Sequence, residues 1–453
     1  MRKVLGLLGV GVLCVLTTLS SAEEVEENEE LSVRLFDRLK ERVFVTGAVK
    51  FETAIETDGD AQKFEFIVQP EIEINVNDDT NIVFVPRMRF DALDELEPGR
   101  PDQDEIAGPS RRWLIGDPLE LEVRELFVET IVGDTYLTVG KQTVVWGESD
   151  GLKVLDVVNP TDLREFGLAD FEDSRIPLWT VNAEIPIKEA TLQLLWIPDT
   201  SKHNIPEMGS TFDLVNIDLP DSINLNIENY ARPRDGFKDS DFGARLSGFW
   251  KGWNLSLNYF YHYDDTPVVY LALAAGDDGV TVTVSPEYER THLIGGTFSK
   301  AFGDLTLRGE LGYSTKKYFD ASILFDPDGV HETGEFGYVI GLDWFGIRDT
   351  MISFQLFQSI LDHDAPGLGR DRVDNTITFL VRRSLKNDTL SVYNILVHNL
   401  NHGDGYVRPK ISYQVNDEMS IWTGFDIFYG GDSGLFGQFD DKDRLVMGME
   451  WSF

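Results

Sequence analysis

The sequence predicts an all-β protein, a transmembrane antiparallel β-barrel of about eighteen strands. Apolar and polar residues alternate with a period of two from Val43 onward, as in strands with one face in lipid and the other in water. Short turns alternate with long connections along the chain. The last strand carries five large apolar residues on one face, which are Leu445, Met447, Met449, Trp451 and Phe453.

The alternation is clear in the first predicted strand, 43–57, where Val49 and Phe51 share one face and Lys50 and Glu52 the other. The same pattern recurs in eighteen segments, and sixteen is the alternative count. The predicted strands are 43–57, 63–76, 81–91, 119–131, 134–146, 178–186, 190–198, 240–250, 253–263, 290–302, 305–315, 336–345, 349–360, 374–384, 388–399, 405–416, 418–430 and 443–453.

The connections predict how the barrel lies in its membrane. Tight-turn residues form the short connections at 132–134, 251–252, 302–304, 386–388 and 416–418. The longer connections are 92–118, 147–177, 199–239, 264–289, 316–335 and 361–373. Short periplasmic turns, long extracellular loops and an even strand number are typical of barrels in the outer membrane of Gram-negative cells, which is the predicted location.

The residues before the barrel form two predicted segments. Residues 1–22 have a basic start, an apolar run that is short for a spanning helix, and small residues before Glu23, so we expect a signal peptide cleaved after Ala22. The acidic segment 23–42 contains leucines four residues apart and predicts a short amphipathic helix. Residues 43–453 are the predicted barrel domain.

Composition excludes several classes of function. A formal net charge of −38 makes nucleic acid an unsuitable partner, because phosphate binding requires a basic surface. The single cysteine, Cys14, lies in the predicted signal peptide, so no disulfide is expected. The histidines lack a zinc-binding spacing, and we expect neither a metal nor a cofactor.

One segment matches a catalytic pattern. Residues 147–151 read G-x-S-x-G, the nucleophile elbow of α/β-hydrolases, which requires a strand-to-helix turn in a doubly wound sheet. Nothing around Ser149 alternates strand with helix, so we interpret the match as chance and expect no enzyme activity.

The polar strand faces supply the predicted pore lining. If the apolar faces point to lipid, the opposite faces point into the lumen, where charges of both signs would select solutes. The alternative is that these side chains only pair across neighbouring strands. The predicted lining residues are Lys50, Glu52, Glu65, Glu71, Glu73, Arg87, Arg89, Arg308, Glu310, Asp343, Arg382, Arg408, Lys410, Asp426, Arg444 and Glu450.

The connection 147–177 is rich in charged and turn residues for a loop. Two interpretations remain open: it folds into the lumen as a constriction, or it is a structural extracellular loop. The candidate constriction residues are Trp146, Glu148, Asp150, Asp156, Asn159, Asp162, Arg164, Asp173 and Arg175.

The same region carries a family resemblance. Gly140-Lys141-Gln142, the WGESDG stretch at 146–151 and VVNPTD at 157–162 resemble a family of uncharacterised proteobacterial outer-membrane proteins. The resemblance implies a porin-like barrel. Some members of that family are encoded beside exporters of the resistance-nodulation-division class, which implies a periplasmic or exporter partner.

The favoured functional hypothesis is a passive channel for small molecules, because barrels of sixteen to eighteen strands leave an aqueous lumen. The alternative is a barrel that binds hydrophobic or lipidic ligands and works with a periplasmic partner or an efflux exporter. Expected partners are outer-membrane lipid and lipopolysaccharide, a small-molecule solute, and the barrel assembly machinery. The last would recognise the terminal strand that ends in Phe453.

Overall fold

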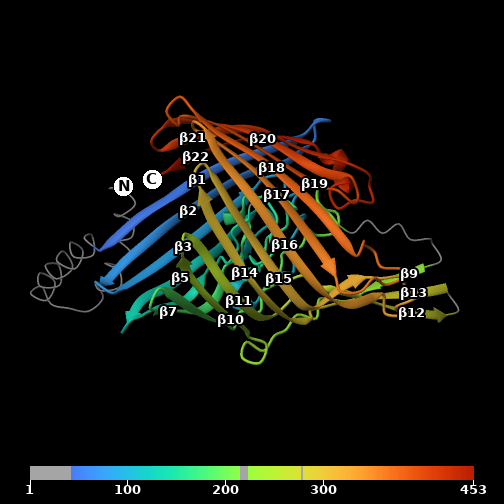
Figure 1. The fold of residues 1–453 in the computed structure, drawn as a ribbon. Helices are drawn as coiled ribbons and strands as arrows, with labels where there is room; N and C mark the ends of the chain where they lie inside the picture. Colours follow the sequence, from blue (N-terminus) through green and yellow to red (C-terminus); the bar gives the residue numbers. More distant parts are fainter. Residues whose placement is uncertain (1–41, 150, 215–222, 277–278) are drawn as a thin grey trace, which may run out of the picture.

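The computed structural model describes residues 42–149, 151–214, 223–276 and 279–453, which form a closed β-barrel (Figure 1). Eighteen antiparallel strands close the wall, as the sequence predicts. They are β1 Val43–Glu56, β2 Ala61–Asn77, β3 Thr80–Asp91, β5 Leu119–Val132, β6 Thr135–Gln142, β7 Leu178–Ile187, β8 Ala190–Ile197, β10 Asp241–Trp250, β11 Trp253–Tyr263, β14 Arg290–Phe302, β15 Leu305–Asp320, β16 Val330–Ile347, β17 Thr350–Leu361, β18 Val373–Leu385, β19 Leu390–Asn399, β20 Asp404–Asn416, β21 Met419–Tyr429 and β22 Arg444–Ser452.

The barrel closes between its first and last strands. β1 pairs with β2 on one side and with β22 on the other, so that Val49 stands opposite Trp451. Gly47 and Phe453 exchange two backbone hydrogen bonds, with N···O distances of 3.1 and 3.0 Å. The closed ladder satisfies the backbone groups that an open sheet edge would expose to lipid.

Both ends of the strand ladder lie at one rim, which we call the turn rim (Figure 1). Tight turns join the strands there, and Gly133 and Gly303 adopt positive φ values of 66° and 65°, which a side chain would disfavour. The opposite rim, the loop rim, carries the longer connections.

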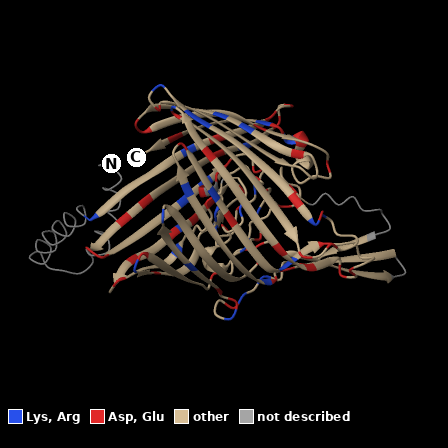
Figure 2. Ribbon diagram, in the orientation of Figure 1, with Lys and Arg blue, Asp and Glu red and all other residues tan. Residues whose placement is uncertain are grey.

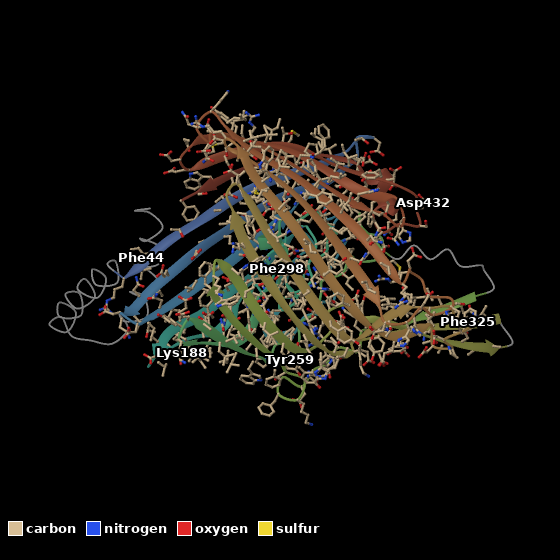
Figure 3. The ribbon with its side chains drawn as sticks, viewed as in Figure 1. Phe44, Lys188, Tyr259, Phe298, Phe325 and Asp432 are labelled. Atoms are coloured by element: carbon tan, nitrogen blue, oxygen red, sulfur yellow. The ribbon has the colours of Figure 1, made fainter. Side chains whose placement is uncertain are left out.

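The outer surface is largely apolar, as the alternation predicts. Phe51, Phe66 and Phe90 stand opposite one another on β1, β2 and β3, and Phe354 stands opposite Phe379 on β17 and β18. The side chains of Phe354 and Phe379 are 47% and 39% exposed. Figure 3 shows the side chains that project from the wall, and Figure 2 shows that charged residues of both signs interrupt the strands and mark the rims.

The long connections contain structure that the sequence analysis missed. A second sheet of three strands extends beyond the loop rim, where β12 Val268–Gly276 pairs with β13 Gly279–Glu287, and β13 pairs in parallel with β9 Ile223–Ile227 (Figure 1). These strands were expected to be loop, because they lie outside the repeating pattern of the wall. They are extended because they pair with one another.

The remaining elements are short. β4 Trp113–Ile115 pairs with β5, the helical turn α3 covers Phe171–Ser174, and 3-10 turns cover η1 Gly108–Ser110 and η2 Gly437–Lys442. The described residues include no helix long and apolar enough to cross a membrane. The predicted signal peptide lies outside the described residues, as does the predicted helix at 31–42 except for Arg42.

Candidate functional site

The lumen wall is most highly charged where the barrel closes. Strand register places Lys50 of β1 opposite Glu450 of β22, Glu52 opposite Glu65 of β2, and Asp426 of β21 opposite Arg444. Because directly opposed residues share a face, these charges line one continuous arc of wall on β21, β22, β1 and β2, which we call the closure arc.

The connection between β6 and β7, residues 143–177, leaves the wall and contacts the opposite side of the barrel. We call it the crossing segment. A Cβ atom placed on Gly151 would lie 3.4 Å from Ile395 of β19 and 3.5 Å from Thr378 of β18. These strands lie half-way around the barrel from β6 and β7.

Backbone hydrogen bonds hold the start of the crossing segment to β15. The Glu310 carboxylate accepts from the backbone N–H of Glu148 at 2.5 Å, of Ser149 at 2.7 Å and of Leu155 at 3.0 Å. Arg308 donates to the Glu148 carbonyl and pairs with Asp343 at 2.8 Å. This second group of predicted lining residues therefore binds the crossing segment.

The first half of the crossing segment also packs through apolar side chains. Trp146 is fully buried beside Phe260 of β11, and its Nε1 donates to Gln193 Oε1 at 2.8 Å. Leu155 is equally buried. The cluster comprises Val144, Trp146, Leu155, Val158, Leu178, Leu195, Ile197, Phe260 and Leu293. Trp146 is therefore part of a packed core and does not line open space.

The second half of the crossing segment is held by charges. Lys63 Nζ lies 2.5 Å from Glu165 and 2.8 Å from Glu52. Arg444 of β22 lies 2.8 Å from Glu165, and Lys50 of β1 lies 3.1 Å from Asp173. The Glu165 carboxylate of the crossing segment thus binds a strand from each end of the barrel sequence, β2 through Lys63 and β22 through Arg444.

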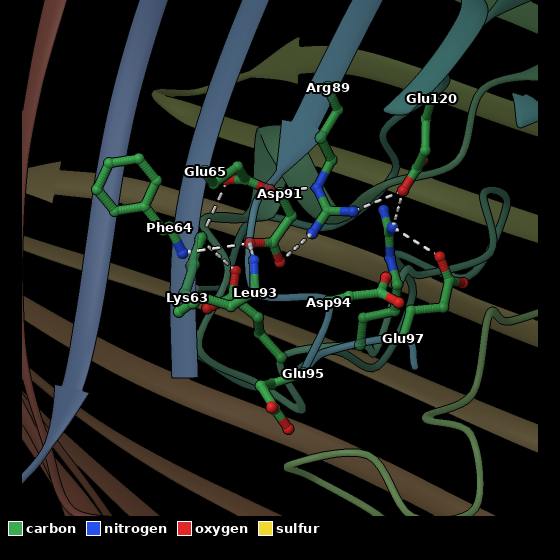
Figure 4. Close-up of polar contacts among 12 residues, drawn as sticks. Lys63, Phe64, Glu65, Arg89, Asp91, Leu93, Asp94, Glu95, Glu97 and Glu120 are labelled. Atoms are coloured by element: carbon green, nitrogen blue, oxygen red, sulfur yellow. Dashed lines mark hydrogen bonds and ion pairs between the residues drawn. The ribbon is translucent and has the colours of Figure 1, made fainter. Parts of the chain in front are cut away.

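A second ion-pair network extends this anchor along β3 and β5. Arg164 of the crossing segment lies 2.7 Å from Glu120, and Arg89 lies 2.5 Å from the same carboxylate. Arg112 binds Glu97 at 2.7 Å. Figure 4 shows Arg89 between the carboxylates of Glu65, Asp91 and Glu120.

The loop carboxylates remain ionised in this setting. Burial acts to raise the pKa of Glu165, but Lys63 and Arg444 outweigh it and hold that pKa well below its usual range. Burial likewise acts to raise the pKa of Asp162, and Arg164 lowers it further than burial raises it. Both carboxylates therefore act as fixed anions.

Other bonds within the segment set its path. Arg175 binds Asp156 at 2.8 Å, and Asn159 accepts a hydrogen bond from the Val144 N–H at 2.7 Å. The Thr161 N–H donates to His203 Nδ1 at 2.8 Å, which joins the segment to the connection after β8. Burial lowers the pKa of His203, consistent with a neutral ring.

Ser149 shows no nucleophile geometry in this structure. Its hydroxyl donates to the Leu152 carbonyl, and its N–H binds Glu310. Asp150, another predicted constriction residue, lies outside the described residues. Among the described residues, no group of three His, Cys, Asp or Glu side chains is placed to hold a metal ion.

Other predicted lining residues form no ion pair with the crossing segment in the described part of the chain. Glu71 and Glu73 stand opposite Thr46 and Phe44 near the turn rim. Lys410 of β20 lies 5.0 Å from the Trp422 ring centroid, and Arg382 of β18 lies 5.6 Å from that of Tyr393. Arg408 binds Asp426 at 2.8 Å.

The sequence analysis missed Lys63 and Glu120 as lumen residues. Lys63 shares the strand parity of Glu65, so alternation alone could have identified it. The face of β5 was ambiguous because a register shift between Val85 and Pro86 interrupts its pairing with β3.

Cavities remain around the crossing segment. One, of about 100 Å³, lies between residues 162–174 and the closure arc. Another, of about 380 Å³, is lined by polar side chains of β7, β8, β10 and β11 and by residues 143–145.

Comparisons with known proteins agree with this architecture. Residues 117–329 match the family described as "Protein of unknown function (DUF1302)", and the chain resembles that family. No curated protein matches the sequence.

Solved structures of outer-membrane porins share the fold. Acinetobacter baumannii OccAB2 is similar with a TM-score of 0.53 and 10% identity, over 91% of this chain and 97% of that one. A. baumannii OccAB3 has a TM-score of 0.52 and 8% identity, over 91% of this chain and 98% of that one. Pseudomonas aeruginosa OpdK with vanillate has a TM-score of 0.51 and 10% identity, over 92% of this chain and 99% of that one. The chain therefore has the porin-like β-barrel fold of these outer-membrane proteins.

Proposed function

We propose that this protein is a passive channel for small polar solutes, in which the crossing segment forms the constriction. The supporting observation is the contact of this segment with β15 and β22 on either side of the barrel and with β18 and β19 half-way around it. Charged and polar side chains surround the space that remains on either side. Such a lumen passes hydrated solutes and selects them by size and charge.

The alternative, a carrier of lipidic ligands, would require a vacant apolar surface inside the barrel. The lumen does contain an apolar cluster, and Phe428 of β21 belongs to it. Phe166, Leu168 and Phe212 from the loops pack there against the wall. The chain's own side chains thus occupy the surface that a lipid would use, which favours the channel.

The proposal includes export and assembly. Residues 1–22 serve as the signal peptide, and the acidic segment 23–42 is where a periplasmic or exporter partner would bind. The terminal strand that ends in Phe453 addresses the chain to the barrel assembly machinery. Lipopolysaccharide surrounds the outer half of the wall.

Planar-bilayer recording of the purified barrel tests the channel. We expect stable open-channel steps, and deletion of residues 148–176 should raise single-channel conductance about twofold or more because it widens the narrowest part of the lumen. Gel migration before and after boiling in detergent would establish that each variant is folded.

The control is a deletion outside the lumen. Replacing residues 268–287, which form β12 and β13 beyond the loop rim, by a short linker should leave conductance unchanged. Equal conductance in wild type and the 148–176 deletion would remove the constriction role. Electrical silence with saturable lipid binding would instead support the carrier.

A further inference from the structure

The cavity between residues 162–174 and the closure arc is unusually basic for this chain. Eight Lys or Arg and seven Asp or Glu side chains line it, although the whole chain carries a formal net charge of −38. Most of these cations are engaged by carboxylates, as Lys63 is by Glu165 and Arg408 by Asp426. A charged ligand would interact most strongly with the lining groups that have no oppositely charged partner.

Two of the lining cations have little or no compensation. Within the described part of the chain, no carboxylate lies within ion-pair distance of Lys410, whose contact is with the Trp422 ring. Arg87 is nine-tenths buried, its closest carboxylate oxygen is 3.6 Å away on Glu122, and its Nε has no hydrogen-bond partner. Asp170 is the lining carboxylate without an ion pair among the described residues.

The charged groups stand beside apolar and aromatic surface. Lys50 lies 5.8 Å from the Trp422 ring centroid, so one indole contacts two ammonium groups. Ile67, Leu168 and Val446 line the same cavity. A buried donor without a partner costs free energy, and an anion that accepted from Arg87 would remove that cost.

We propose that this cavity binds a small organic anion with a flat apolar body. Its carboxylate would lie among Lys50, Arg87 and Lys410, and its body against Trp422 and the aliphatic side chains. The lining combines aliphatic and aromatic surface with a few convergent charged groups, as sites for small organic ligands do. The inference rests on the proposed channel and names the substrate class that the channel would admit.

Calorimetric titration of the purified barrel in detergent with benzoate tests the site. We expect saturable binding of benzoate, and about tenfold weaker binding of the uncharged analogue benzamide, because a charge-assisted contact is lost. Lys410→Gln should weaken benzoate binding about tenfold, and Lys410→Arg, which keeps the charge, should retain it.

Lys300→Gln is the matched control. Lys300 also lies over an indole, 5.2 Å from the Trp253 centroid, but it is on β14 near the turn rim, away from the cavity. This variant should bind benzoate like wild type. No saturable benzoate binding, equal binding of benzamide, or binding unchanged by Lys410→Gln would each overturn the proposal.

The titration separates this proposal from the channel. It requires no ion flow, so a barrel that binds benzoate but passes no current would refute the channel and leave the site. A conducting barrel that does not bind benzoate would refute the site and leave the channel.

Discussion

The two halves of the crossing segment are fixed to the barrel by different physics. Residues 144–158 pack apolar side chains around Trp146, whereas residues 162–175 rely on buried ion pairs around Glu165. Apolar packing stabilises through the area removed from water and is insensitive to direction. Buried ion pairs contribute little net stability, but a single partner cannot be removed without leaving a charge uncompensated.

The comparison indicates how each half would fail. Loss of an apolar side chain leaves a void whose cost depends on how far the surroundings collapse. Loss of one charge leaves its counter-ions buried and repelling one another. The ion pairs around Glu165 should therefore respond to neutralisation of one partner, and the packing around Trp146 should respond neither to neutralisation of those partners nor to pH.

Lys63→Met should have the largest effect. It removes the ammonium group that Glu52, Glu65 and Glu165 share, and we expect it to lower the free energy of unfolding by about 3–5 kcal/mol. Urea unfolding of the barrel in lipid vesicles measures this. Adding Glu165→Gln should restore part of the loss, and a double variant with no recovery would contradict coupling between the two residues.

Trp146→Ala should cost slightly less, about 3 kcal/mol, because a fully buried indole is replaced by a cavity. The same measurement should give the same decrease in the free energy of unfolding at pH 8 and at pH 5. Phe237→Ala is the control, since that ring is 79% exposed and should change stability by less than about 0.5 kcal/mol. A loss at Trp146 that depended on pH would break the distinction between the halves.

Acidification should weaken the hydrogen bond that the Thr161 N–H donates to His203 Nδ1. Burial lowers the folded pKa of His203, so below an unfolded value of about 6.5 the unfolded chain binds a proton that the folded chain does not. The free energy of unfolding should therefore fall as the pH is lowered from 7 to 5. His203→Gln should flatten that slope, and an unchanged slope would assign the dependence to another group.

The smallest effect is expected at an exposed ion pair. Lys316 and Glu332 are 3.1 Å apart with side chains 49% and 48% exposed. Lys316→Met should therefore change the free energy of unfolding by less than about 1 kcal/mol. A change as large as that of Lys63→Met would mean that burial does not govern these pairs.

The wall was predictable because lipid imposes one rule on every strand. The alternation that begins at Val43 identified all eighteen strands and placed Lys50, Arg89 and Arg444 on one side. The β9, β12 and β13 sheet was not predictable, since strands beyond the membrane need only pair with one another.

The candidate site was only partly predictable. Asp173 and Arg164 were candidates from composition, but their partners Lys50 and Glu120 come from strands at least 40 residues away in sequence. Periodicity indicates which way a side chain points, and it does not indicate what lies opposite across a lumen. The Trp422 ring, for example, lies 5.8 Å from Lys50 and 5.0 Å from Lys410, and these two lysines come from opposite ends of the sequence.

The backbone hydrogen bonds between Gly47 and Phe453 determine when the barrel can close during its biogenesis. The first strand finds its second neighbour only when β22, the last of the eighteen to be synthesised, has arrived. Until then two unpaired edges persist, and each can recruit a foreign strand. A chaperone or a membrane-bound template must shield these edges during export, and a nonsense mutation that removes β22 would leave them permanently unpaired.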